Sequence, residues 1–297
     1  MRLKTRRRIR SLQEGLKLLW EDDETRIRRK YRGQLGRDPD LDHPTTLNEK
    51  ILWLNLRQRD PRRVSCSDKV SVRDYVRARV GEKYLVPLLG VFTDPEDIDL
   101  EALPDRFIIK AAHGSGWNLI VSDRHSLDWE RAKRTLGDWL ARSYHAHKRE
   151  WHYRHVPRRL VIEELLQDAH GGIPDDYKIW CLRESGRETQ FIQVDMDRFT
   201  DHKRNYYDTE WNRLPFHKAD APPSPVDPPR PGNLGEMLHV ARELSAGFRL
   251  VRVDLYSLPD RVYFGEMTFT PDAGMARLVP EEWDRKLGQL VELPPGP

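Results

Sequence analysis

Apolar and polar positions alternate with a period of two over much of the chain after residue 107. This period is typical of strands, because successive side chains of a strand point to opposite faces. The predicted strands are FIIKAA, NLIVSD, RLVIEELL, DYKIWCLR, TQFIQVD, RLVRVDLYS and RVYFGEMTFT. Helices are expected among them only at about 126–143 and 233–246. Antiparallel-looking strands with few helices indicate an α+β fold and not a doubly wound nucleotide fold.

The earlier part of the chain has a helical period instead. Residues 11–36 look helical and highly charged, and Thr46 precedes Glu49 at capping-box spacing, so a helix should follow in DLDHPTTLNEKILWLNLRQ. SDKVSVRDYVRARVGEKYLV predicts a further helix that ends at Gly81, and PLLGVF a short strand. The proline-rich segment 221–233 is expected to be a surface connection.

Composition narrows the class of protein. The chain has 297 residues, 38% hydrophobic and 33% charged, which suits one large domain or two subdomains. Its 51 basic and 48 acidic residues nearly balance, which argues against nucleic acid as a partner. Cys66 and Cys181 form no disulfide framework and are expected to be buried fillers in a cytoplasmic protein.

The N-terminal sequence MRLKTRRRIRSLQ is basic but lacks the apolar core of a signal peptide, and no run of 18 apolar residues follows. We therefore expect a protein that is neither secreted nor membrane-spanning. The basic cluster suits a solvated tail; its alternative role is peripheral contact with the anionic inner face of the membrane.

The glycine loop HGSG lies between two predicted strands, with Lys110 upstream of it. Gly114 and Gly116 let backbone N–H groups approach a ligand closely, and Ser115 adds a hydroxyl donor. The loop is not a Walker loop, in which the lysine follows the last glycine, and it lacks the third glycine of a dinucleotide fingerprint. A lysine in an apolar strand is costly unless it faces a cleft and meets an anion. We expect a hairpin whose tip folds over phosphates; an ordinary surface hairpin is the alternative.

Two acids are expected to meet on neighbouring strands near the C-terminus. Arg252 and Asp254 share one face of a strand, and Glu266 and Thr268 share a face of the next. The short connection SLPDR would pair these strands antiparallel, which brings Asp254 and Glu266 together. Adjacent carboxylates repel unless a cation lies between them, and magnesium is the expected cation. Arg252 would stabilise charge on a transferring group. A surface hairpin with solvated charges is the alternative.

Two further segments carry weaker signals. RRLVIEELLQD is able to present a backbone edge to adenine, with Glu163 accepting from the exocyclic amine and Leu166 offering its amide, although a plain strand end fits equally well. The histidines of YHAHKREWHYRH match no single-metal spacing, so we expect there a basic, aromatic surface near the acceptor substrate.

Taken together, Lys110 with HGSG, VIEELL, DYK, RVDLY and FGEMTFTP resemble an ATP-grasp enzyme, specifically the TupA-like family named for teichuronopeptide biosynthesis. The resemblance runs from about residue 40 to 290 and includes the long motifs PTTLNEKILWL, SDKVSVRDYV, DYKIWC and HKRNYYDTEWN. It implies an ATP-grasp fold, in which two α+β subdomains hold the nucleotide between them.

The resemblance also implies a role for each matching position. The implied catalytic residues are Arg252, Lys178 and Arg198. The implied ATP-binding residues are Lys110, His113, Gly114, Ser115, Gly116, Glu163, Glu164, Leu166, Asp176, Lys203 and Arg204. The implied Mg²⁺ ligands are Asp254, Glu266 and Thr268. Many ATP-grasp ligases have asparagine where this chain has the threonine.

The implied activity is that of a carboxylate–amine ligase, which transfers the γ-phosphoryl of ATP to a carboxylate and lets an amine attack the acyl-phosphate. By analogy the acceptor belongs to a cell-surface polysaccharide or an amino-acid polymer. A kinase acting on a sugar hydroxyl is the alternative on the same scaffold. The spare cations Arg198, Lys203 and Arg204 favour the ligase, because it must also hold an anionic substrate. A polysaccharide-binding module would leave the paired acids without a role.

We expect the chain to divide into a basic helical extension at 1–40, an N-terminal α/β subdomain at 41–105, a small subdomain with the glycine loop at 106–168, and a C-terminal subdomain with the metal site at 169–297.

Overall fold

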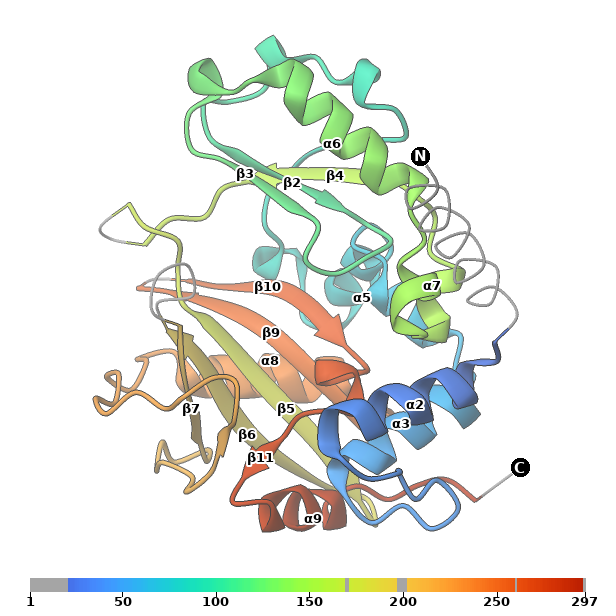
Figure 1. Cartoon of the computed structure of the whole chain (residues 1–297). Coiled ribbons are helices and arrows are strands. Elements are labelled where there is room, and N and C mark those ends of the chain that lie inside the picture. Colours follow the sequence, from blue (N-terminus) through green and yellow to red (C-terminus); the bar gives the residue numbers. More distant parts are fainter. Residues whose placement is uncertain (1–20, 169–170, 197–201, 260, 296–297) are drawn as a thin grey trace.

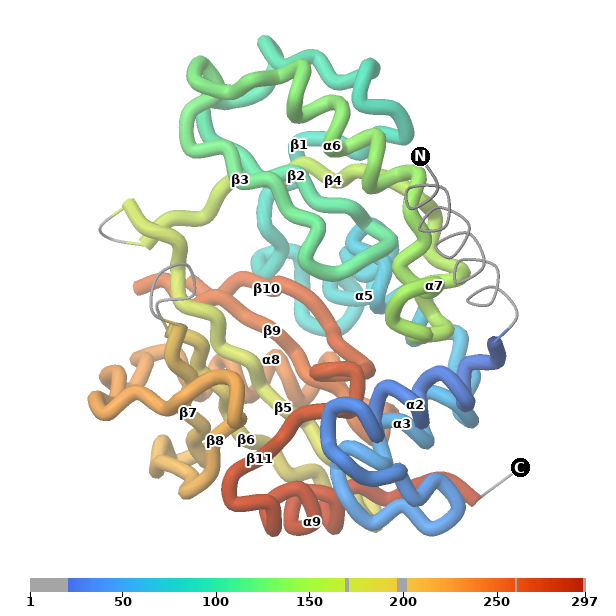
Figure 2. The backbone as a smooth tube through the Cα atoms, in the orientation of Figure 1, coloured from blue at the N-terminus to red at the C-terminus, as the bar shows by residue number. Residues whose placement is uncertain are grey.

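The computed structural model describes residues 21–168, 171–196, 202–259 and 261–295. The basic cluster of the first ten residues and Arg198 lie outside the described residues. Two sheets dominate the described part, and in the view of Figure 1 the smaller lies above the larger. Figure 2 traces the chain from the small sheet, through the segment that follows residue 164, into the large sheet. This mixed, antiparallel architecture confirms the predicted α+β class.

The large sheet has the order β10-β9-β5-β6-β7 in the described part of the chain, with every neighbouring pair antiparallel. Its strands are β5 (Asp176–Glu184), β6 (Arg187–Met196), β7 (Lys203–Tyr207), β9 (Leu250–Leu258) and β10 (Arg261–Thr268). Four of these strands were predicted. The fifth, β7, was missed because its sequence KRNYY does not alternate.

The two faces of the large sheet differ in what covers them. Ile179 and Val253 pack in the core that includes helix α8 (Leu234–Ser245), which lies behind the sheet in Figure 1. Trp180 and Leu250 pack in a second core on the other face, with helices α3 (Leu47–Arg57) and α9 (Glu282–Gln289). The strand alternation therefore places Arg252 on the face opposite to α8.

The small sheet has the order β1-β4-β2-β3 in the described residues. Its strands are β1 (Leu88–Phe92), β2 (Phe107–Ala111), β3 (Asn118–Val121) and β4 (Leu160–Glu164). One face packs against helix α6 (Trp129–Ala141), which contributes the fully buried Leu136 to the core. The predicted strands and the helix at about 126–143 are confirmed, and β1 joins this sheet although it precedes residue 106.

The other α-helices and strands of the described residues are α2 (Asp23–Leu35), α4 (Arg62–Ser67), α5 (Val72–Arg79), α7 (Tyr144–Lys148), and the paired two-residue strands β8 (His217–Lys218) and β11 (Leu278–Val279). The segment 221–233 forms no helix and no named strand, as predicted. Within the described residues, no helix combines the length and apolar character that crossing a membrane requires.

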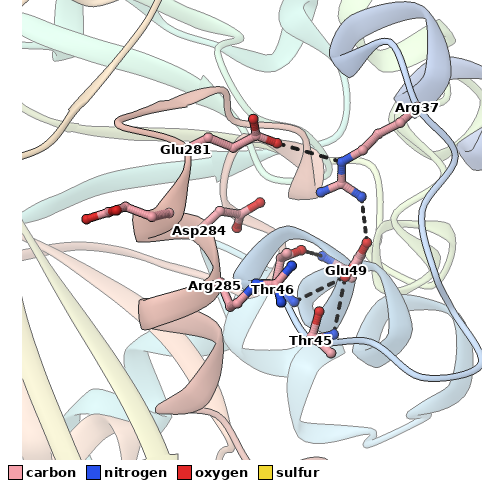
Figure 3. A pocket seen from close by; sticks show the side chains of 8 residues that line it. Arg37, Thr45, Thr46, Glu49, Glu281, Asp284 and Arg285 are labelled. Carbon is pink, nitrogen blue, oxygen red and sulfur yellow. Dashed lines mark hydrogen bonds and ion pairs between the residues drawn. The ribbon is translucent and has the colours of Figure 1, made fainter.

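Helix α3 begins as the sequence predicts. Thr46 accepts from the Glu49 amide, and Glu49 accepts in return from the amides of Thr46 and Thr45 (Figure 3). Asp284 of α9 accepts from the Asn48 amide at 2.9 Å. The hollow of about 480 Å³ in Figure 3 is therefore lined by groups that hold a helix start and join two helices.

Both cysteines are free and buried, and burial raises the pKa of each thiol to about 12. A thiol with such a pKa is a poor nucleophile. Cys66 and Cys181 therefore act as core fillers, as the sequence predicts.

Candidate active site

Two cavities lie where the small sheet faces the large one. The hairpin cavity, of about 690 Å³, is lined by residues that include Lys110, Gly116, Asn118, Glu164, Leu166, Asp176, Asp195 and Tyr256. The charged cavity, of about 720 Å³, is lined by residues that include Lys30, Ser115, Tyr144, Lys148, Glu150, Tyr153, Lys178, Asp195, Arg204, Arg252, Glu266 and Thr268. Asp195 lines both cavities, so they adjoin.

The glycine loop is the tip of a β2–β3 hairpin, as predicted, closed by a bond from the Ala111 amide to the Trp117 carbonyl. Gly116 adopts a φ of 77°, a left-handed conformation that favours glycine. A Cβ at position 114 would lie 2.7 Å from the Trp117 ring, so only glycine fits without a shift. Ser115 reaches the charged cavity while Gly116 lines the hairpin cavity. The tip therefore lies beside both.

Lys110 lies on β2 beneath this tip. Its Nζ contacts Glu163 Oε2 at 2.7 Å, and Arg73 of α5 contacts the other oxygen of Glu163 at 2.9 Å. Glu163 is buried, and its carboxylate has two cations as partners. In this structure Glu163 therefore positions the lysine, and the predicted contact of Glu163 with adenine stays a prediction.

The end of β4 is shaped by pairing on both sides. Because β4 lies between β1 and β2, its backbone is used within the sheet up to Glu164, whose amide donates to Pro87. Glu164 and Leu166 line the hairpin cavity. The predicted backbone edge for adenine would therefore lie after the strand, at residues 165–166, and adenine contact there stays a prediction.

A network of buried charges lies on the large sheet where the cavities meet. Lys178 Nζ lies 2.8 Å from Asp176, 3.1 Å from Asp254 and 3.7 Å from Asp195. Burial alone would lower the pKa of Lys178, but the carboxylates, Asp254 first, raise it above its usual value. Lys178 therefore stays charged despite its burial.

Arg252 and Asp254 share a face of β9, as predicted. The guanidinium donates to both oxygens of Asp254, at 2.7 and 2.8 Å. Burial opposes ionisation of Asp254, but Arg252 and then Lys178 hold the pKa of this carboxyl below its usual value. The pKa of Arg252 is raised in turn, against burial, chiefly by Asp254. Such a two-pronged bond fixes the orientation of the guanidinium.

Asp254 and Glu266 are direct partners across β9 and β10, which confirms the predicted pairing. Glu266 has a side chain 35% exposed, and its nearest contacts are Thr268 Oγ1 at 3.4 Å and Arg252 at 3.9 Å. In the part of the chain that the structure describes, no three His, Cys, Asp or Glu side chains gather as a metal site. Glu266 and Thr268 line the charged cavity, whereas Asp254 is buried and lines neither cavity. A carboxylate and a hydroxyl facing a cavity suit Mg²⁺, which takes few protein oxygens and completes its shell with water and phosphate. The role of Asp254 as a third ligand stays a prediction.

Of the two remaining predicted phosphate ligands, Arg204 and Lys203, only Arg204 lines a cavity. Arg204 lines the charged cavity and contacts Asp195 at 2.6 Å, where it holds the pKa of that carboxyl well below its usual range against the effect of burial. His202 Nε2 lies 2.8 Å from Asp195 Oδ1, the oxygen that also accepts from Arg204. Lys203, the next residue on β7, does not line either cavity.

His113 is buried, and its Nε2 lies 3.0 Å from the Trp139 carbonyl of α6. Its ring stacks edge-on against Trp117 at 5.3 Å. Burial lowers the pKa of His113, so the neutral ring is favoured. The structure thus places His113 beneath the loop, away from both cavities, and its role in ATP binding stays a prediction.

The segment 144–153 contributes Tyr144, Lys148, Glu150 and Tyr153 to one wall of the charged cavity, and the expected place of the acceptor there stays a prediction. The rings of Tyr144 and Tyr153 pack at 4.6 Å, and Lys148 and Glu150 accompany them. Glu150 is buried, and burial raises the pKa of its carboxyl to about 7.

Sequence reasoning missed several residues of the site. Lys69, from the turn before α5, donates to the Gly114 carbonyl at 2.8 Å and so supports the loop. Arg73, Glu150 and Asp195 were also missed, as was Lys30 of α2. Their separation along the chain hides them; the strand alternation in TQFIQVD gave the only signal, for Asp195.

The profile of the TupA-like ATPgrasp family matches residues 49–292, and the chain belongs to this family. This match confirms the predicted family. No curated protein matches the chain.

Among solved structures, the chain is similar to the D-alanine–D-alanine ligase of Helicobacter pylori, with 12% identity, a TM-score of 0.47 and coverage of 84% of this chain and 70% of that one. It is also similar to the ATP complex of the Bacillus anthracis D-alanine–D-alanine ligase, with 17% identity, a TM-score of 0.44 and coverage of 76% and 62%. An N5-carboxyaminoimidazole ribonucleotide synthetase bound to ADP has 9% identity, a TM-score of 0.43 and coverage of 69% of this chain. The chain spans only 45% of that synthetase.

Membership of this family places the chain among the ATP-grasp proteins, the class that the sequence predicts.

Proposed function

We propose that this chain phosphorylates a carboxylate with ATP and then joins it to an amine of a cell-surface polysaccharide or an amino-acid polymer, at the cytoplasmic face of the membrane. The observation that carries the proposal is the junction at Asp195, where the hairpin cavity meets the charged cavity. A nucleotide in the first cavity would direct its terminal phosphate toward the second, which has room for a substrate.

In the hairpin cavity, Leu166 and the backbone after β4 would contact adenine, with Glu164 beside them and Asp176 near the ribose. Lys110 would neutralise phosphate charge, with Glu163 holding its ammonium in place at 2.7 Å. Gly114 and Gly116 would let the loop backbone close over the phosphates, because neither carries a side chain.

At the junction, Asp254, Glu266 and Thr268 would hold Mg²⁺. When bound, the ion would neutralise charge on the phosphates during transfer. Glu266 has only long contacts, at 3.4 Å to Thr268 and 3.9 Å to Arg252, whereas Asp254 accepts from Arg252 at 2.7 and 2.8 Å. Asp254 would thus both ligate the ion and orient the guanidinium.

The proposed reaction has two steps, phosphoryl transfer to the carboxylate and attack of the amine on the acyl-phosphate. A substrate carboxylate oxygen attacks the γ-phosphorus, a new O–P bond forms, and the bond to ADP breaks. The amine nitrogen then attacks the acyl carbon, the C–O bond to phosphate breaks, and the nitrogen loses a proton. Arg252 and Lys178, and with them Arg204 and Arg198, would stabilise the charge on the acyl-phosphate and the tetrahedral intermediate.

A trapping experiment tests this reaction. ADP release with ATP and Mg²⁺ is measured against amino acids and uronic acids, with hydroxylamine added to convert any acyl-phosphate into a hydroxamate. We expect a hydroxamate with wild type that is lost in Glu266→Ala and Lys110→Ala. ADP release with a phosphorylated sugar and no hydroxamate would instead identify a kinase.

A further inference from the structure

The cations of the charged cavity fall into two groups. Four of them have a carboxylate as a close partner: Lys178 with Asp176, Arg204 with Asp195, Lys218 with Asp272, and Arg252 with Asp254. These pairs satisfy one another before any ligand enters. The charge of these four cations is therefore largely neutralised by carboxylates of the protein.

Lys30 of α2 and Lys148 of α7 form the second group. Lys30 Nζ donates to the His147 carbonyl, a neutral acceptor. Within the described ranges, neither lysine forms an ion pair with a carboxylate. Both line the charged cavity.

The surroundings of Lys30 are positive. Burial first, and then the charges of Arg26, Lys148 and Arg149, lower the pKa of Lys30 to about 8. Glu150 lies in the same cavity wall as Lys148, but with its raised pKa of about 7 it is an incomplete counter-ion near neutral pH. Lys30 is half-buried and Lys148 is exposed, while Arg149 already pairs with Asp23. The two lysines therefore repel each other with no paired carboxylate between them, and a bound anion would relieve that repulsion.

We propose that Lys30 and Lys148 bind a second anionic group, a carboxylate or a phosphate, of the substrate that occupies the charged cavity. The proposal rests on the proposed function, because it assigns that cavity to the substrate. It narrows the substrate class to molecules with at least two anionic groups, such as acidic amino acids, their polymers or phosphorylated acids.

Helix α2 is held against the rest of the cavity wall by specific contacts. Asp23, at its start, contacts Arg149 at 3.1 Å and His145 at 3.5 Å. These contacts join α2 to α7 (Figure 1), and the ammonium of Lys30 donates to the carbonyl of His147, the residue before Lys148. Because α2 precedes residue 49, where the family match begins, the subsite depends on a segment outside the matched region.

Calorimetric titration in the presence of ADP and Mg²⁺ tests the subsite without turnover. The probes are L-glutamate and O-phospho-L-serine, which carry a second anionic group, and L-glutamine, which does not. The proteins are wild type, Lys30→Met, Lys30→Arg and Lys148→Met. Lys286→Met, whose lysine pairs with Glu282 on the surface of α9, is the matched control.

We expect each methionine variant to weaken binding of L-glutamate or O-phospho-L-serine at least tenfold, with Lys30→Arg retaining most of the affinity and Lys286→Met unchanged. Tighter binding of phosphoserine would identify a phosphate group, and tighter binding of glutamate a carboxylate. The affinity for ADP and Mg²⁺ reports whether each variant keeps a folded cleft.

Equal weakening for L-glutamine, no weakening in either methionine variant, or no binding of any probe by wild type would overturn the subsite. The outcome is separable from that of the hydroxamate test. If charge-dependent binding is found but no hydroxamate forms, the ligase mechanism falls and the subsite stands; the reverse result leaves the mechanism standing and removes the subsite.

Discussion

The hairpin cavity and the charged cavity are similar in size, about 690 and 720 Å³, but they are built in different ways. The first is formed mainly by the β2–β3 hairpin and by the described residues between β4 and β5. The second draws on segments from Lys30 to Met275, and its buried ion pairs join β5, β6, β7 and β9. Local geometry thus shapes the hairpin cavity, and long-range charge pairing shapes the charged cavity.

The largest expected effect comes from breaking the charge network. Lys178→Met leaves Asp176, Asp195 and Asp254 without their common cation, and loss of one partner in a buried pair costs roughly 3–5 kcal/mol. We expect the free energy of unfolding, measured by urea denaturation, to fall by about that amount. Lys286→Met should change it by less than about 0.5 kcal/mol. A loss below about 1 kcal/mol for Lys178→Met would show that the network does not stabilise the charged cavity.

The next effect separates activity from stability. Glu266→Gln removes a carboxylate whose side chain is 35% exposed and weakly paired. The free energy of unfolding should therefore change by less than about 1 kcal/mol. If Glu266 binds Mg²⁺, substrate-dependent ADP release should fall about 100-fold or more. Steady-state ADP release measures the expected loss of activity, and the midpoint of thermal unfolding measures the expected small change in stability. Near-normal release would remove Glu266 from the metal site.

A pH effect distinguishes the wall of the charged cavity. The pKa of Glu150 is about 7 in the folded chain, above the value of 4.5 for an ordinary glutamate. Its protonated form therefore contributes stability that is fully present below about pH 4.5 and is lost as the pH rises through 7. As the pH rises from 5 to 8, the free energy of unfolding of Glu150→Gln should rise by about 1–3 kcal/mol relative to that of wild type. Parallel stability curves for the two proteins would contradict the buried position of this carboxyl.

The smallest effect concerns the hairpin cavity alone. Gly114→Ala places a Cβ against the Trp117 ring, which should cost about 1–3 kcal/mol of stability and weaken ADP binding. Gly137→Ala on α6, where nothing lies within 4 Å, should instead stabilise by about 0.5–1 kcal/mol. Denaturation and ADP titration of both variants make the comparison. Equal effects would mean that the loop does not need its glycine.

The difference between the cavities also explains what the sequence could predict. Strand alternation, the capping box at Thr46 and the hairpin around Lys110 depend on near neighbours, and the structure confirms them. The pairing of Asp254 with Glu266 was also predictable, because a short connection fixes the register of two strands.

The charged cavity was predictable only in part, because packing brings distant segments together. No pattern around Lys30 or Glu150 indicates that they face Arg252 across one cavity, and the contacts of Lys69 with the glycine loop cross 45 residues of sequence. The division into subdomains and the assignment of His113, Lys203 and Arg198 to the site stay predictions.

Transfer of oxygen from substrate to phosphate tests the central claim most directly. A carboxylate substrate found by ADP release is labelled with ¹⁸O in both carboxyl oxygens, and the inorganic phosphate formed with the amine acceptor is analysed by mass spectrometry. An acyl-phosphate at the junction of the cavities requires one ¹⁸O atom in each phosphate released. Phosphate without label would contradict carboxylate activation by this enzyme.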